Sequence, residues 1–148
     1  MVTVDQIKKL REETGVSVGE CQKALKEAGG DLGMAKEILR KRGKDFAKKR
    51  MEKEAGQGLV ESYIHPGKKV GAMVELRCES DFVARSDDFQ KLAHELCLQV
   101  TAISAEEIPL LEQTWIKDES KNIKELIDEY IVKFGENIVL KKFVRYEI

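Results

Sequence analysis

Residues 56–78 have the sequence GQGLVESYIHPGKKVGAMVELRC, and this segment decides the fold class of the larger part of the chain. Two runs of strand-forming residues, 59–65 and 70–78, are joined by Pro66-Gly67-Lys68-Lys69. Pro66 and Gly67 suit the two central positions of a type II turn. In the second run apolar positions alternate with others: Ala72, Val74, Leu76 and Cys78 against Met73, Glu75 and Arg77. We therefore predict an antiparallel hairpin with one buried face.

The residues that follow the hairpin predict two long helices and a third strand. Apolar side chains recur at spacings of three and four over 87–103 and again over 123–134. Gly135 closes the second helix, because glycine most easily adopts the left-handed conformation at a helix end. Residues 137–146 are rich in Ile, Val and Phe, which favour a strand. Three strands and two helices predict an α+β core domain over 56–148, built on a three-stranded antiparallel sheet with flanking helices.

The beginning of the chain predicts three short helices. Thr3-Gln6 and Ser17-Glu20 fit the capping box, in which a side chain and a backbone amide satisfy each other at a helix start. Three glycine positions predict the helix ends: Gly15, Gly29-Gly30 and Gly43. We expect a three-helix bundle over 1–43 and a basic helical linker over 44–55.

The linker region is strongly basic. Residues 40–54 carry eight basic and three acidic side chains, a local charge of +5. A solvated helical linker is one interpretation, and an RNA-binding stripe at residues 40–53 is the alternative. The stripe contains a single aromatic residue, Phe46, and no base-reading motif. We therefore expect no specific nucleic acid partner.

Composition limits the classes of protein that the chain can belong to. It has 148 residues, with 26 Lys and Arg against 27 Asp and Glu, so the net charge of −1 gives no global attraction to nucleic acid or anionic lipid. No apolar run approaches the roughly 20 residues that cross a bilayer, and we expect no membrane partner. Three widely spaced cysteines and no secretory signal layout predict reduced thiols and a cytoplasmic location.

Searches for catalytic chemistry give negative results. His94-Glu95-Leu96-Cys97-Leu98 begins like the zinc motif H-E-x-x-H, but Leu98 stands where the second histidine is needed. No phosphate-binding glycine loop, dinucleotide fingerprint or nucleophile elbow is present. We expect no enzyme activity, no cofactor and no metal site.

Residues 78–89, CESDFVARSDDF, form the most unusual segment. Ser80 can cap a short helical turn after the second strand. Two alternatives remain for Phe82. It folds into the core together with Val83, or it projects from a loop held between a strand and a helix and anchors an interface.

Three stretches, in order along the chain, carry a resemblance to a known family. The segment Glu79-Ser80-Asp81-Phe82-Val83-Ala84-Arg85 is similar to the Thr-Asp-Phe-Val signature of translation elongation factor Ts. Residues 10–17 and 21–25 resemble its ubiquitin-associated-like bundle. Residues 135–138 and 145–147 match its core. The resemblance covers most of the chain.

The resemblance implies a guanine-nucleotide exchange factor for elongation factor Tu, with no catalytic chemistry of its own. It implies that the loop dislodges Mg²⁺ in the partner through Ser80, Asp81, Phe82 and Val83. Phe82 would supply the displacement, Val83 would support it, and Asp81 would hold the loop or a partner group. It also implies that the bundle docks on the nucleotide-binding domain through Leu10, Arg11, Val16, Val18 and Gly19.

The chain departs from the family pattern at three places. Ser80 replaces the usual threonine, Val18-Gly19 replaces larger apolar residues, and a helical stretch is missing at Pro109-Leu110. The single copy of the core, where long members have two related halves, predicts a homodimer. The bundle by itself leaves one alternative open, a ubiquitin-like or peptide-binding adaptor.

Overall fold

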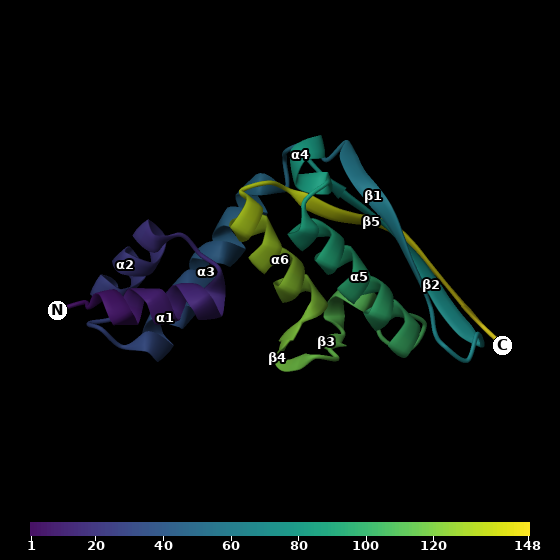
Figure 1. The fold of residues 1–148 in the computed structure, drawn as a ribbon, viewed down its shortest axis with the longest axis horizontal. Coiled ribbons are helices and arrows are strands. Elements are labelled where there is room, and N and C mark those ends of the chain that lie inside the picture. Colours follow the sequence, from purple (N-terminus) through teal and green to yellow (C-terminus); the bar gives the residue numbers. More distant parts are fainter. The chain divides into compact units, whose positions relative to one another are not determined.

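The computed structural model describes all 148 residues and divides the chain into two compact units, residues 1–49 and 50–148. The first unit is helical, and the second is a sheet with helices (Figure 1). This arrangement confirms the predicted α+β class. None of the helices combines the length and apolar character that a membrane-spanning segment needs.

The first unit consists of three helices: α1 (Val4–Thr14), α2 (Val18–Glu27) and α3 (Leu32–Arg50). The predicted capping box at Thr3 and Gln6 is present, and Gly15 closes α1 with φ 70°. At α2 only half of the predicted capping box forms. The Ser17 side chain accepts a hydrogen bond from the amide of Glu20, but the Glu20 side chain does not accept one from the amide of Ser17. Small and branched side chains from all three helices fill the core: Leu10, Cys21, Ala24, Leu25, Ala28, Ala35 and Leu39.

The predicted end of the third helix at Gly43 is wrong. α3 continues to Arg50, and both Gly43 and Ala47 are buried. A glycine inside a helix costs only about 1 kcal/mol relative to alanine, and the helix-forming residues that follow it contain no proline. The region predicted as a helical linker is therefore helical only as far as Arg50, and residues 51–56 form turns and irregular chain.

The second unit is organised on a three-stranded antiparallel sheet in the order β1 (Gln57–Ile64), β2 (Val70–Cys78), β5 (Ile138–Glu147). Two helices, α5 (Asp87–Ala102) and α6 (Ile123–Phe134), lie on one face of this sheet (Figure 1). Gly135 closes α6 with φ 69°, as predicted. The side chains between sheet and helices are buried: Ala72, Val74, Leu76, Cys78, Phe89, Leu92, Ala93, Leu96, Cys97, Val100, Ile123, Leu126, Ile127, Ile131 and Ile138.

The hairpin connection differs from the predicted type II turn. The amide of Lys68 donates to the carbonyl of His65 at 2.8 Å, but the left-handed residue is Lys68 (φ 58°) and not Gly67. A type II turn needs a positive φ at its third residue, so the Pro66-Gly67 turn is of another type. A left-handed residue directly after the turn is the usual arrangement of longer hairpin loops.

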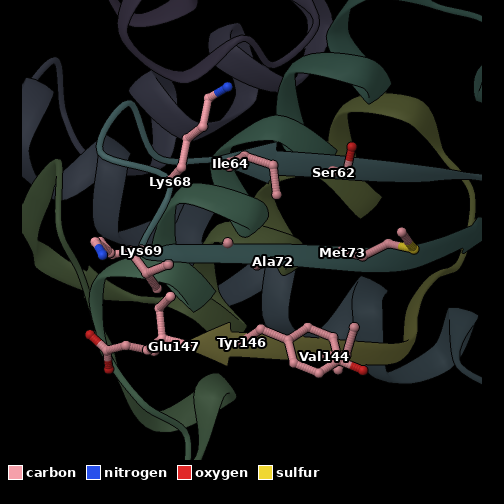
Figure 2. Close-up of a pocket in the computed structure, with 12 residues that line it drawn as sticks. Ser62, Ile64, Lys68, Lys69, Ala72, Met73, Val144, Tyr146 and Glu147 are labelled. Atoms are coloured by element: carbon pink, nitrogen blue, oxygen red, sulfur yellow. The ribbon is translucent and has the colours of Figure 1, made fainter.

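No other element of this unit covers the second face of the sheet, which we call the open sheet face. Apolar side chains from all three strands are exposed on it: Val60, Ile64, Met73, Val144 and Tyr146. Figure 2 shows a shallow pocket on this face, with Ile64, Met73 and Tyr146 around it. Gly71 lies between Ile64 and Tyr146 in the strand register, and a Cβ there would lie 2.5 Å from Ile64 Cδ1, so glycine lets the Ile64 side chain lie over β2.

Candidate functional site

The Ser80–Val83 segment begins a single helical turn, α4 (Asp81–Ala84), between the end of β2 and the start of α5. Ser80 is its N-cap, and its Oγ accepts a hydrogen bond from the amide of Val83 at 3.2 Å. Ser86 then donates to the carbonyl of Val83 at 2.7 Å and accepts from the amide of Phe89. The turn is thus fixed at both ends by serine hydroxyls.

Phe82 and Val83 have opposite environments. Phe82 is 86% exposed, whereas Val83 and Ala84 are each 5% exposed and pack into the core. The alternative that buries both Phe82 and Val83 is wrong for Phe82 and correct for Val83. The capped turn directs Val83 and Ala84 inward, so the ring between Asp81 and Val83 has to point away from the core.

Asp81 forms an ion pair with Arg85, with Arg85 Nε 2.7 Å from Asp81 Oδ2. Both side chains are exposed, and such pairs contribute only about 0.3–0.5 kcal/mol because water screens them. Either charged group can therefore exchange its partner for a group on another molecule at little cost.

Glu136, between α6 and β5, binds the loop directly. It follows Gly135, the residue that closes α6. Its Oε1 accepts hydrogen bonds from the amides of Glu79 and Ser80, at 3.1 and 2.9 Å. Its Oε2 accepts a third, from Ser80 Oγ at 2.6 Å. One carboxylate thus satisfies three donors on two consecutive residues of the segment.

Glu79 is held by a second set of contacts. Arg50 donates two parallel hydrogen bonds to its carboxylate, Nε to Oε2 at 2.8 Å and Nη2 to Oε1 at 2.9 Å, and the amide of Asn137 donates to Oε2. Burial would raise the pKa of Glu79, but the Asn137 amide and the Arg50 guanidinium together hold that pKa below its ordinary value of 4.5. Glu79 therefore stays charged at neutral pH.

Cys78 lies beneath the loop and is fully buried. Its Sγ donates to the carbonyl of Ser80 at 3.2 Å. Burial, followed by the nearby charge of Glu136, raises the pKa of this thiol to about 11. Cys78 is thus a protonated packing group, as the sequence predicts, and not a nucleophile.

The residues predicted to dock the bundle do not all share one surface. Arg11, Val18 and Gly19 are exposed and Val16 is partly buried, whereas Leu10 is completely buried in the core of the bundle. Direct contact with another molecule is thus available to four of the five, and Leu10 can only support them from below.

Comparison with known proteins assigns the family. A family model described as Elongation factor TS matches residues 79–148, the part that contains the capped loop and Glu136. Elongation factor Ts of Herpetosiphon aurantiacus is 38% identical, over 99% of this chain and 98% of that protein. The protein of the same name from Moorella thermoacetica is 37% identical, over 100% of this chain and 96% of its own length.

The chain belongs to the elongation factor Ts family. The resemblance that the sequence shows is thereby confirmed, and the chain is assigned to the elongation factors of translation. The alignment with the Herpetosiphon elongation factor Ts runs over 193 positions, 45 more than the 148 residues of this chain. The helical stretch predicted to be missing at Pro109-Leu110 would account for this difference.

At that point the chain forms a short 3₁₀ turn, η1 (Leu110–Glu112). A small hairpin of β3 (Thr114–Trp115) and β4 (Asp118–Asn122) follows it. Two buried glutamines attach this region to α5. Gln99 Nε2 donates to Gln113 Oε1 at 3.0 Å, and Gln113 Nε2 donates to the carbonyl of Ile108 at 2.8 Å. The second bond joins the two sides of the predicted junction.

Sequence reasoning identified the loop but missed the side chains that hold it. Glu79, Glu136 and Asn137 all lie within the stretches that carry the family resemblance, yet no role was predicted for them, and Arg50 was assigned to the linker. One sequence signal for them was available: Glu79 directly follows a predicted strand and Glu136 follows the glycine that closes a predicted helix, where carboxylates can accept hydrogen bonds from backbone amides. Their pairing depends on strand register and could not be deduced from one sequence.

Proposed function

We propose that this chain promotes the release of GDP from elongation factor Tu by inserting the Ser80–Val83 loop near the Mg²⁺ site of that partner. The observation that carries the proposal is the exposure of Phe82 on a capped turn whose neighbours are buried. An aromatic ring that a protein holds exposed and fixed loses little conformational freedom on binding, which suits it to anchor an interface.

Displacement of a magnesium ion is a sensible route to nucleotide release. Mg²⁺ requires nearly ideal octahedral geometry between phosphate and protein oxygens, so a small shift of one ligand weakens nucleotide binding strongly. A factor that binds the nucleotide-free state more tightly must weaken nucleotide binding by the same factor. The chain itself makes and breaks no bond in this scheme, so we propose an exchange factor and not an enzyme.

In this proposal the helical bundle supplies a second contact. Arg11, Val16, Val18 and Gly19 would touch the nucleotide-binding domain of the partner, while buried Leu10 would fix the helix that carries Arg11. Val18 is 47% exposed near the start of α2 and is a suitable apolar contact. The bundle (residues 1–43) and the core (residues 56–148) would then act as separate binding modules in the cytoplasm.

The test is the rate of release of labelled GDP from elongation factor Tu. The chain should accelerate release, and Phe82→Ala should reduce the acceleration at saturating factor by about tenfold or more, the effect of an interface hot spot. Phe46→Ala, which removes a partly exposed ring from α3, is the matched control and should change little. Undiminished exchange by Phe82→Ala would contradict the role of the ring.

The same assay can test the bundle contact separately from the contact of Phe82. Val18→Asp should raise the concentration of factor needed for half-maximal acceleration, because it adds a charge at an apolar contact, while the rate at saturation stays close to that of the wild type. An unchanged concentration dependence would remove the bundle from the interface.

A further inference from the structure

We infer that Glu136 is a positioning residue for exchange: it holds the Ser80–Val83 loop in the conformation that presents Phe82. This inference rests on the proposed exchange function, which gives the loop its task. It concerns a residue outside the loop, 56 positions away from Ser80 in the sequence.

The first argument is the concentration of donors on one carboxylate. Three donors, the amides of Glu79 and Ser80 and the hydroxyl of Ser80, converge on Glu136 at 2.6–3.1 Å. Hydrogen bonds to an ionised acceptor are shorter and stronger than those between neutral groups. Ser80 Oγ, the same atom that caps α4, is one of the three, so Glu136 orients the cap itself.

The second argument is that the loop has few other sources of order. α4 has only four residues, too few for an isolated helix to be stable in water. The ring of Phe82 contributes no anchoring, because it is almost entirely exposed and takes part in no aromatic pair within the protein. Removal of the Glu136 carboxylate would therefore leave the turn mobile even if the sheet and helices stay folded.

The third argument is that Glu136 is one of several residues that fix the segment before Phe82. Glu79, whose amide binds Glu136, has its own carboxylate fixed by Arg50 and by the amide of Asn137. Asn137 Nδ2 in turn donates to the carbonyl of Lys53 at 2.8 Å. The segment before Phe82 is thus fixed on both sides, and Glu136 is the member that reaches the capping serine.

The principal test is a double-mutant cycle in the GDP-release assay. Glu136→Ala alone should reduce the acceleration about tenfold. Adding Phe82→Ala to Glu136→Ala should then reduce the acceleration by at most about a further twofold, because a ring that is no longer held in the binding conformation contributes little to exchange. Fully multiplicative losses would overturn the inference, since a residue that affects only general stability acts independently of the ring.

A second measurement uses the protein alone and reads the loop directly. Cys78 is buried beneath the loop, and its Sγ bonds to Ser80, whereas Cys97 is buried elsewhere and bonds to the carbonyl of Glu61. The rate of alkylation by iodoacetamide is resolved for each cysteine by mass spectrometry and followed against pH, so that it can be expressed per thiolate and the loss of the Glu136 charge does not affect it. This rate per thiolate should be at least tenfold faster at Cys78 in Glu136→Ala, with Cys97 unchanged. Equal acceleration at both cysteines, or none at Cys78, would contradict a local positioning role.

The conservative variant provides the control. Glu136→Gln keeps the shape and one carbonyl acceptor for the two amides but loses the charge, so both readouts should fall between those of the wild type and Glu136→Ala. If Glu136→Gln behaves like the alanine variant in alkylation, charge and not shape holds the loop. If the wild-type chain fails to accelerate GDP release, the proposed function is wrong, and the alkylation result still decides whether Glu136 fixes the loop.

Discussion

Glu79 shows how one charged side chain can tie several elements together. Its carboxylate is mostly buried, yet Arg50 and the Asn137 amide supply three donors to its two oxygens. A buried carboxylate without such partners would be protonated or would destabilise the fold. Its lowered pKa therefore links the stability of the second unit to pH.

The predicted consequence is a loss of stability in acid that depends on Glu79. Because its pKa is lower in the folded chain than in the unfolded chain, the charged form stabilises the fold fully above the ordinary value of 4.5, and this contribution disappears as the pH falls through the folded-state value. Glu79→Gln should lower the free energy of unfolding at pH 7 by about 1–2 kcal/mol. It should also reduce the slope of stability against pH below 4.5.

Urea unfolding at several pH values measures both effects. Glu119→Gln, at an exposed position of β4, is the control and should leave stability within about 0.5 kcal/mol of the wild type at pH 7. The same acid slope in Glu79→Gln and the wild type would show that the contacts of Glu79 do not govern the pH dependence.

The orientation of single residues was the least predictable feature of the site. Phe82 and Val83 are adjacent and both apolar, so hydrophobicity alone does not say which one is buried. The Ser80 cap was predictable from the sequence, but the inward direction of Val83 depends on how the turn meets β2 and α5. Leu10 shows the reverse case: a residue assigned to a surface by family resemblance is fully buried.

At the scale of elements, the hairpin of β1 and β2 depends on a close backbone approach at Gly58. This residue has φ 151°, and a Cβ placed there would lie 2.1 Å from the carbonyl oxygen of Leu76 and 2.8 Å from the Cα of Arg77. Those atoms belong to the paired strand and cannot move aside without breaking the register. Only glycine fits this position.

Gly58→Ala should therefore lower the free energy of unfolding by about 2–3 kcal/mol, through backbone strain and the clash with β2. Gly67→Ala, in the turn of the same hairpin, is the matched control, because a Cβ there would meet no atom within 4 Å and its φ is not positive. It should change stability by no more than about 0.5 kcal/mol. Equal effects of the two substitutions in thermal or urea unfolding would refute the clash at Gly58.

Elements with strong periodic patterns were predictable, and elements that depend on distant partners were not. The helix over 123–134 was expected with its closing glycine, and β5 was expected within one residue at each end. The small hairpin of β3 and β4 was missed because its strands are short and polar and are held by buried Gln99 and Gln113. α3 was predicted too short because an interior glycine looks the same as a closing one in the sequence.

For the molecule as a whole, the open sheet face is the feature that most needs a partner. It presents apolar side chains from three strands, with Tyr146 75% exposed. Ile64, Met73 and Tyr146 come from β1, β2 and β5 (Figure 2), so a second copy related by a two-fold axis would bury these side chains against the same side chains of its partner. The net charge of −1 gives no general repulsion between copies. We propose that the homodimer predicted from the sequence forms through this face.

Sedimentation velocity over a range of concentrations tests this proposal. The wild type should be dimeric at about 10–100 μM, a range suited to a micromolar dissociation constant. Met73→Glu should make it monomeric, because its charge would enter the centre of an apolar interface without a partner. Ile116→Glu adds the same charge at an exposed apolar position between β3 and β4 and should leave the dimer intact. A wild type that stays monomeric up to about 100 μM, or an equal loss in both variants, would exclude a dimer through the open sheet face.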